Sequence, residues 1–132
     1  MICHMAITGL SCIFPTPDMR RTAAFYQEKC GFRAEFYLQC EQPHVCLYRD
    51  EVEIILTHSE NKAVVPNREL YGTGYDAYLY ADQLRALQDT MTKAGVILVQ
   101  PLHSTDYLNS EFVIEDCDRR WLAFGHKELA RT

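Results

Sequence analysis

The stretch AITGLSCIFPTPDMRRTAAFYQEKCGF, residues 6–32, contains the features that decide the fold. Residues 6–14 have the apolar content of a strand, and the turn residues at 15–17 close it. Asp18 can cap a helix that ends at Gly31, because aspartate accepts backbone N–H groups at helix starts and glycine tolerates the left-handed conformation at helix ends. One face of this helix is formed by Met19, Ala23, Tyr26 and Cys30. The stretch therefore predicts a strand followed by an amphipathic helix.

The same order of elements occurs twice along the chain. After the first helix, the patterning predicts strands at about 32–39, 44–49 and 52–58, and then a polar linker at about 59–72. A strand at 73–80 and a helix capped by Asp82 follow, and this helix ends at Gly95. Its apolar face carries Leu84, Leu87 and Met91, and the remaining strands are expected at about 96–100, 109–115 and 120–126.

Residue identities support an internal duplication. Asp18 and Gly31 recur 64 residues later as Asp82 and Gly95. Near the module ends, Asp50 and His58 recur 68 residues later as Asp118 and His126. The sequence thus predicts a single domain of 132 residues built from two βαβββ modules, at about 6–58 and 73–126.

The fold class that follows is α+β, with the duplicated modules forming an eight-strand curved mixed sheet. One helix per module covers only one face of its four strands, so the other face is left uncovered. Two modules side by side produce a concave surface, which is the expected place for a small-molecule ligand.

Composition and charge exclude several classes of protein. Hydrophobic residues make up 48% and charged residues 23% of the chain, as in ordinary globular proteins. No apolar run reaches the roughly 18 residues of a membrane span, and the first residues lack the pattern of a signal peptide, so we expect a cytoplasmic protein with no membrane partner. The six cysteines contain no C-x-x-C pair, which favours reduced thiols, and a net charge of −5 disfavours nucleic acid as a partner.

Two phrases carry a resemblance to a known family. TPDMRRTAAFYQEKCGF (16–32) and FVIEDCDRRWLAFGH (112–126) resemble the vicinal oxygen chelate superfamily, which includes glyoxalase I, ring-cleaving dioxygenases and the bleomycin resistance proteins. The resemblance covers roughly residues 6–127 and implies the duplicated fold that the patterning predicts independently. It also implies a homodimer.

Enzymes of this family hold a divalent metal with four side chains, two from each module. Carried over by the resemblance, those positions fall on Ser11, Ile55, Tyr75 and Ala123 in this sequence. Neither isoleucine nor alanine can bind a metal, and neutral serine and tyrosine bind metals poorly. We therefore expect no metal site and no cofactor.

The resemblance also decides which side chains face the expected cavity. Ile55 is a cavity position, so Glu53 shares its face, while His58 and the equivalent His126 are expected as partly exposed residues at strand ends. Glu53 is either a displaced metal ligand, a carboxylate that attracts a cationic ligand, or a solvated glutamate. Trp121, on the cavity face, either stacks on a ligand or fills the concavity. The expected ligand-binding residues are Ser11, Glu53, Ile55, Tyr75, Trp121 and Ala123, and no catalytic residue is assigned.

Two functions remain open at this point. The first is metal-independent binding and sequestration of a drug-like or aromatic, including cationic, small molecule, as the resemblance to bleomycin resistance proteins implies. The second is a glyoxalase-like lyase or isomerase that uses Glu53 as base and Tyr75 as acid, or a metal held by displaced ligands. Acid–base catalysis requires both groups within hydrogen-bond reach of one substrate, which a sequence does not reveal.

Overall fold

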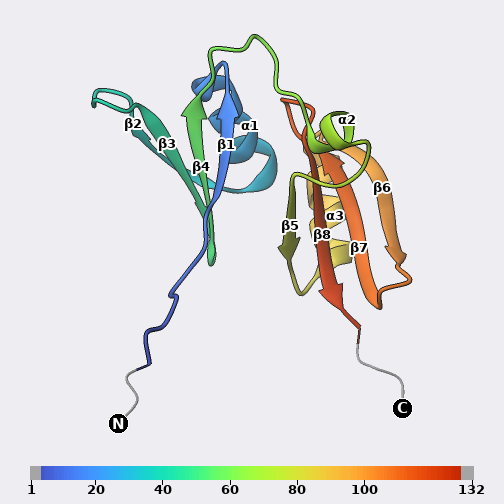
Figure 1. Ribbon diagram of the computed structural model, residues 1–132. Helices are drawn as coiled ribbons and strands as arrows, with labels where there is room; N and C mark the ends of the chain where they lie inside the picture. The colour runs from blue at the N-terminus through green and yellow to red at the C-terminus, as the bar shows by residue number, and fades with distance from the viewer. Residues whose placement is uncertain (1–3, 129–132) are drawn as a thin grey trace.

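The computed structural model describes residues 4–128 and has the predicted duplicated order of elements (Figure 1). The first module contains β1 (Cys12–Thr16), α1 (Met19–Cys30), β2 (Arg33–Tyr37), β3 (His44–Arg49) and β4 (Val52–His58). A short helix, α2 (Asn67–Tyr71), lies in the connection. The second module contains β5 (Ala77–Tyr80), α3 (Leu84–Lys93), β6 (Ile97–Ser104), β7 (Asn109–Glu115) and β8 (Trp121–Lys127).

The strands of the two modules are connected in the same way. The sheet orders are β1-β4-β3-β2 and β5-β8-β7-β6, with the first and last strands of each module parallel and the other neighbours antiparallel. The predicted α+β fold of two βαβββ modules is confirmed. Within residues 4–128 the eight strands are divided between two four-stranded sheets, so the two sheets are not hydrogen-bonded to each other.

The first helix forms as its sequence predicts. Asp18 Oδ1 accepts a hydrogen bond from the backbone N–H of Arg21 at 3.0 Å, and Gly31 adopts φ 71° just beyond the last turn. Ala23 and Tyr26, on the predicted apolar face, are fully buried. A local capping signal and the packing of one face therefore agree on this helix.

The second helix begins differently from the prediction. Gln83, not Asp82, occupies the N-cap position, and no side chain caps the helix. The helix is instead held by its packed face, where Leu84 and Met91 are buried and the Gln88 side chain accepts the backbone N–H of Leu102 at 2.6 Å. Tertiary contacts here replace the expected cap.

Two strands start later than expected, so the site residues Ser11 and Tyr75 lie just before a strand and not within one. The strand expected at 6–14 starts only at Cys12, where pairing with Ile54 of β4 begins, and the strand expected at 73–80 starts only at Ala77. Residues 4–11 are extended and lead away from the first sheet (Figure 1). No helix within residues 4–128 is long and apolar enough to span a membrane.

Each sheet has one face covered by a long helix and one face that no long helix covers, which we call its bare face. On β4, Ile54 and Leu56 are buried against α1, whereas Glu53, Ile55 and Thr57 on the other face are partly exposed. In the second module α3 covers the face that carries Phe112, Ile114, Leu122 and Phe124. The predicted alternation of covered and uncovered side chains is therefore observed in β4.

A buried ionic cluster joins the modules. Arg120, only 2% exposed, reaches from the β7–β8 turn to the Pro15 carbonyl at β1 and pairs with Asp116 and Asp118 at 3.2 and 3.3 Å. From α1, the Tyr26 hydroxyl donates to Asp116 at 2.6 Å and the Thr22 hydroxyl donates to Asp118 at 2.7 Å.

The pKa of Asp116 is raised and that of Asp118 is lowered, because the balance between burial and pairing differs at the two carboxylates. Burial raises the pKa of Asp116, although the Arg120 guanidinium and the Tyr26 hydroxyl oppose the effect. At Asp118 burial also raises the pKa. Hydrogen bonds from Thr22, Thr16 and Arg21 lower it by more than burial raises it, so the pKa of Asp118 lies below its ordinary value. The cluster fixes α1 against the second module.

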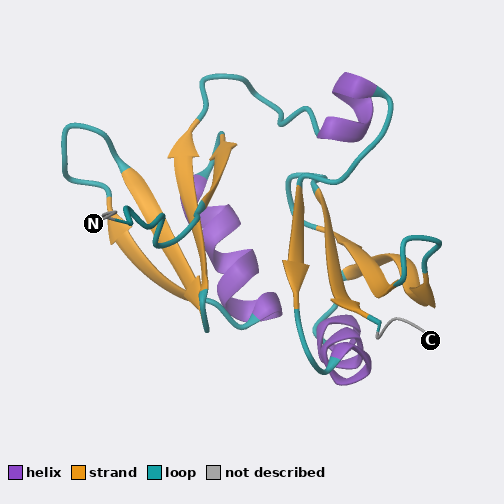
Figure 2. Ribbon diagram, turned by 60° about the horizontal axis from the view of Figure 1, so that its bottom comes forward, coloured by secondary structure: helices purple, strands orange, loops and turns teal. Residues whose placement is uncertain are grey.

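The cluster also determines where the bare faces point. Because α1 lies between the first sheet and the second module, the bare face of the first sheet is turned away from the second sheet (Figures 1 and 2). The chain therefore presents two separate bare faces.

Candidate functional site

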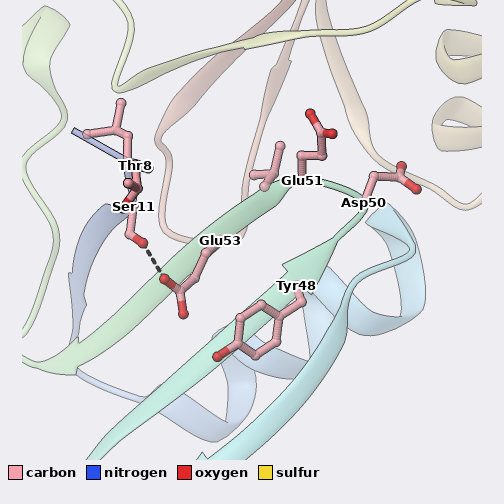
Figure 3. A pocket seen from close by; sticks show the side chains of 9 residues that line it. Thr8, Ser11, Tyr48, Asp50, Glu51 and Glu53 are labelled. Carbon is pink, nitrogen blue, oxygen red and sulfur yellow. Dashed lines mark hydrogen bonds between the residues drawn. The ribbon is translucent and has the colours of Figure 1, made fainter. Parts of the chain in front are cut away.

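Ser11 and Glu53 meet on the bare face of the first sheet (Figure 3). Glu53 belongs to β4, and Ser11 immediately precedes β1, the neighbouring strand, so the Ser11 hydroxyl donates a hydrogen bond to Glu53 Oε1. Both residues border an open hollow of about 450 Å³ between the N-terminal segment and the β3–β4 turn. Its other lining residues are Thr8, Gly9, Leu10, Tyr48, Asp50, Glu51 and Val52.

The hollow is acidic. Asp50 and Glu51 stand exposed at the turn beside Glu53, and in residues 4–128 the only salt bridge to any of these three is from Arg49 to Asp50, at 3.8 Å. The hydrogen bond from Ser11, followed by that from Tyr48, lowers the pKa of Glu53, while the contact with Glu53 raises the pKa of Tyr48. The hollow thus holds a stably ionised carboxylate and is suited to a positively charged group.

An apolar surface lies beside the acidic one. Ile55 follows Glu53 on the same face of β4 and pairs in register with Ile13 of β1, whose side chain is 62% exposed. Ser11, Glu53 and Ile55, expected to line a pocket, are therefore brought together on one face.

The remaining expected residues belong to the second sheet, and they differ in accessibility. Tyr75, just before β5, and Trp121, at the start of β8, are partly exposed. Ala123 is fully buried, paired in register with Tyr78 of β5 and Val113 of β7. Ala123 therefore offers no contact surface to a ligand in this chain.

The Trp121 ring is already in contact with a cation. The Arg68 guanidinium, from α2, lies 4.1 Å from the centre of the indole ring, and the indole N–H donates to Glu115 at 3.1 Å. Arg68 also approaches Glu115 at 3.5 Å. The sequence pattern of the linker does not reveal this contact, because it depends on how the linker folds back over β8.

Tyr75 is part of a cluster that sequence reasoning did not identify. Its hydroxyl donates to the buried Glu111 of β7 at 3.0 Å, and the hydroxyls of Tyr78 and Tyr107 donate to the same carboxylate. A glutamate within a strand is usually exposed to solvent, so its position alone did not single it out.

The structure also places two histidines expected at strand ends and one aspartate for which the sequence suggested no role. His58 and His126 are exposed at strand ends, as expected. Asp76 accepts the backbone N–H groups of Asn67 and Trp121, both at 3.0 Å, so it joins the start of α2 to the start of β8. These contacts satisfy the carboxylate.

The metal that the family resemblance implies does not fit these residues. Of the four corresponding positions, Ile55 and Ala123 have no donor atom, the Ser11 hydroxyl is bonded to Glu53, and the Tyr75 hydroxyl is bonded to Glu111. Across residues 4–128, no three His, Cys, Asp or Glu side chains come together in a group that can hold a metal ion.

Comparisons with known proteins agree on the fold. The sequence profile described as Glyoxalase/Bleomycin resistance protein/Dioxygenase superfamily matches residues 4–124. The crystal structure of UcmS2 superposes with a TM-score of 0.71 at 21% identity, covering 92% of this chain and 98% of that one. A member of that superfamily from Sphaerobacter thermophilus gives 0.71 at 18% identity, with the same 92% and 98% coverage. A glyoxalase-related enzyme from Clostridium phytofermentans gives 0.73 at 14% identity, covering 95% and 98%.

At these identities the structural likeness concerns the fold and not the activity. No curated protein was found to match the chain.

Proposed function

The chain belongs to the glyoxalase/bleomycin resistance protein/dioxygenase superfamily, and we propose that within it this protein binds and sequesters a small cationic aromatic molecule without a metal. The observation that carries the proposal is the acidic hollow at Glu53, which Ser11 lines with its hydroxyl. Ile55, at another of the family's metal-ligand positions, adds an apolar side chain next to the hollow on the same face of β4. An ionised carboxylate beside an apolar surface matches a ligand that is both charged and aromatic.

Acid–base catalysis by Glu53 and Tyr75 has less support. Hydrogen bonding lowers the pKa of Glu53, which makes it a weaker base, and burial followed by the Glu111 contact raises the pKa of Tyr75, which makes it a weaker acid. A catalytic pair needs shifts in the opposite directions to work near neutral pH. The two side chains also belong to different sheets and bond to different partners.

A second copy of the chain is the partner that best fits the remaining exposed surface. Met5, Ile7 and Leu10 lie on an extended segment and are about 90% exposed or more, and β1 and β5 are open edge strands. An open edge strand can pair with another chain, and a group of neighbouring exposed apolar side chains marks a surface that another chain can cover. We propose a homodimer in which the bare face of the first sheet meets the bare face of the second sheet of the other copy, since a two-fold arrangement covers both faces at once.

Metal content provides a direct test of the first part of the proposal. We expect the purified protein to contain far less than one nickel, zinc, iron or manganese ion per chain, because its family ligand positions offer only two neutral hydroxyls. Elemental analysis after incubation with each ion and gel filtration measures this. One tightly held ion per chain contradicts metal independence.

Charge recognition at Glu53 is tested at pH 8 with N-methylacridinium, a permanent aromatic cation, and its parent acridine, which is uncharged at that pH. We expect Glu53→Gln to weaken N-methylacridinium binding about three- to fivefold, the range of a partly exposed charge pair, and to leave acridine binding unchanged. Isothermal titration calorimetry measures both affinities. Glu41→Gln, in an exposed loop, makes the same charge change away from the hollow and serves as control.

The pH dependence of the same binding has a defined sign. Because the pKa of Glu53 is lowered, its charge persists as pH falls, so we expect constant N-methylacridinium affinity from pH 8 to about 5 and loss only below the ordinary glutamate pKa of about 4.3. Equal affinity for both probes, or a Glu53→Gln protein that behaves like Glu41→Gln, contradicts the proposed site.

A further inference from the structure

Three phenols converge on one buried carboxylate in the second module. Glu111, on β7, is 1% exposed; Tyr78 donates to its Oε1 at 2.8 Å, Tyr75 donates to its Oε2 at 3.0 Å, and Tyr107 also donates to Oε1. The donors come from β5, from the residues before it and from the β6–β7 loop. Three separate segments of the chain thus place a hydroxyl at the same carboxylate.

Glu111 has no cationic partner within the described residues 4–128. None of the salt bridges there includes it. Two basic residues share its face: His103, its partner on β6, and Lys127 of β8. The Nδ1 atom of His103 contacts the Pro101 carbonyl, and the Lys127 ammonium lies 6.0 Å from the centre of the Tyr80 ring. The cluster is therefore a site of uncompensated negative charge, and such a site favours a cation.

The packing around Tyr78 fixes the cluster in place. A Cβ atom at Gly125 would lie 2.0 Å from the Tyr78 hydroxyl, so the ring needs a glycine beneath it. Asn109 donates to the Tyr78 oxygen at 2.8 Å. This phenol is thus positioned before any ligand arrives.

The phenols retain their protons and keep acceptor capacity. Burial raises the pKa of all three phenols, and hydrogen bonding to Glu111 raises it further. The pKa of Tyr78 is raised to about 12, and those of Tyr75 and Tyr107 are also raised. A phenol oxygen that donates its proton to a carboxylate can still accept a hydrogen bond from another donor. Tyr107 is 54% exposed, so its oxygen is within reach of solvent and of a ligand.

We propose that Glu111 with Tyr75, Tyr78 and Tyr107 forms a subsite for a protonated amine. The ammonium N–H groups donate to the Tyr75 and Tyr107 oxygens, Glu111 supplies the opposite charge, and the rings of Tyr78 and Tyr80, 5.2 Å apart, provide aromatic contact for the carbon skeleton. This inference rests on the proposed small-molecule binding function, and it adds a specific chemical group, an amine N–H donor, and a second location on the other sheet.

The experiment uses phenethylammonium and its neutral isostere 2-phenylethanol, titrated into the whole protein and followed by amide chemical shifts. We expect phenethylammonium to shift the amides of residues 107–112 and to bind about tenfold more tightly there than the alcohol, as for a hydrogen bond to a charged group. Tyr107→Phe removes one acceptor from an exposed position and should weaken this binding several-fold without affecting the fold. Glu111→Gln should remove the preference for the cation. Tyr71→Phe, an exposed tyrosine elsewhere, is the matched control.

The outcomes separate this subsite from the hollow at Glu53. Shifts at 107–112 that respond to Tyr107→Phe and Glu111→Gln but not to Glu53→Gln support the inference. Shifts confined to residues 8–11 and 48–53 overturn it and leave the proposed function standing. Equal affinity for amine and alcohol at 107–112, a Tyr107→Phe protein identical to Tyr71→Phe, or no shift with either probe also overturns it.

Discussion

Replacing Arg120 with methionine is expected to lower the free energy of unfolding by about 3–5 kcal/mol, the cost of leaving buried charges without their partner. Arg120 is the cation of a cluster in which Asp116 and Asp118 are also buried. Methionine fills much of the same volume, so the decrease in the free energy of unfolding comes mainly from the lost charge and hydrogen bonds and less from lost packing. The Arg120 guanidinium also lies 4.5 Å from the centre of the Phe14 ring and reaches the Pro15 carbonyl, and these contacts between modules disappear too.

The neighbouring arginine provides a matched control. Arg119 is exposed, and its partner Glu69 is also exposed, so Arg119→Met should lower the free energy of unfolding far less than Arg120→Met does. Urea denaturation followed by circular dichroism measures both variants. If Arg120→Met does not fold, Tyr26→Phe, which removes one hydrogen bond to Asp116, should still show a loss of about 1–3 kcal/mol. Equal effects of the two arginine substitutions contradict the role of the cluster.

The second large effect concerns the proposed homodimer. The double substitution Ile7→Asp and Leu10→Asp is expected to convert it to a monomer, because these side chains are 96% and 89% exposed in the single chain and become buried in the dimer. Burial of an aliphatic side chain contributes about 1.5–3 kcal/mol, and a symmetric interface loses it twice for each position. The dissociation constant should therefore rise by at least about a thousandfold.

Sedimentation velocity measures this change directly. A control with the same added charge, Gln39→Asp together with Gln42→Asp, alters an exposed loop and should remain dimeric. Circular dichroism of the monomeric variant should match the wild type, since residues 4–11 lie outside the strands and helices of the chain. A wild-type protein that sediments as a monomer contradicts the proposed assembly.

Local signals predicted the fold best where packing agreed with them. Asp18 and Gly31 mark the two ends of α1 as expected, because the capping groups and the buried face specify the same helix. Asp82 has a side chain suited to capping but does not cap α3. The helix begins at Leu84, whose side chain packs in the core. The strand expected from residue 6 begins at Cys12, where pairing in register with Ile54 starts, and residues 6–9 lie beyond the start of β4 at Val52 and have no partner strand there.

The candidate site was predicted in part. Alternation along β4 correctly placed Glu53 and Ile55 together on the face opposite Ile54 and Leu56, because the two-residue period of a strand is a local property. The contacts of Trp121 with Arg68, and of Tyr75 with Glu111, join residues 53 and 36 positions apart in the sequence. No periodicity relates such positions, so sequence patterns did not reveal them.

The placing of Ile55 and Ala123 at two metal-ligand positions of the family came from the resemblance. By itself the sequence determined the duplicated βαβββ order and the uncovered face of each sheet. These features depend on residue type and on short-range periodicity, which can be read along the chain. Only the tertiary structure decided that α1 lies between the two modules, that Arg120 joins them, and that three tyrosines meet at Glu111. Those features depend on which distant segments come into contact, and that choice is made by the packing of the whole core.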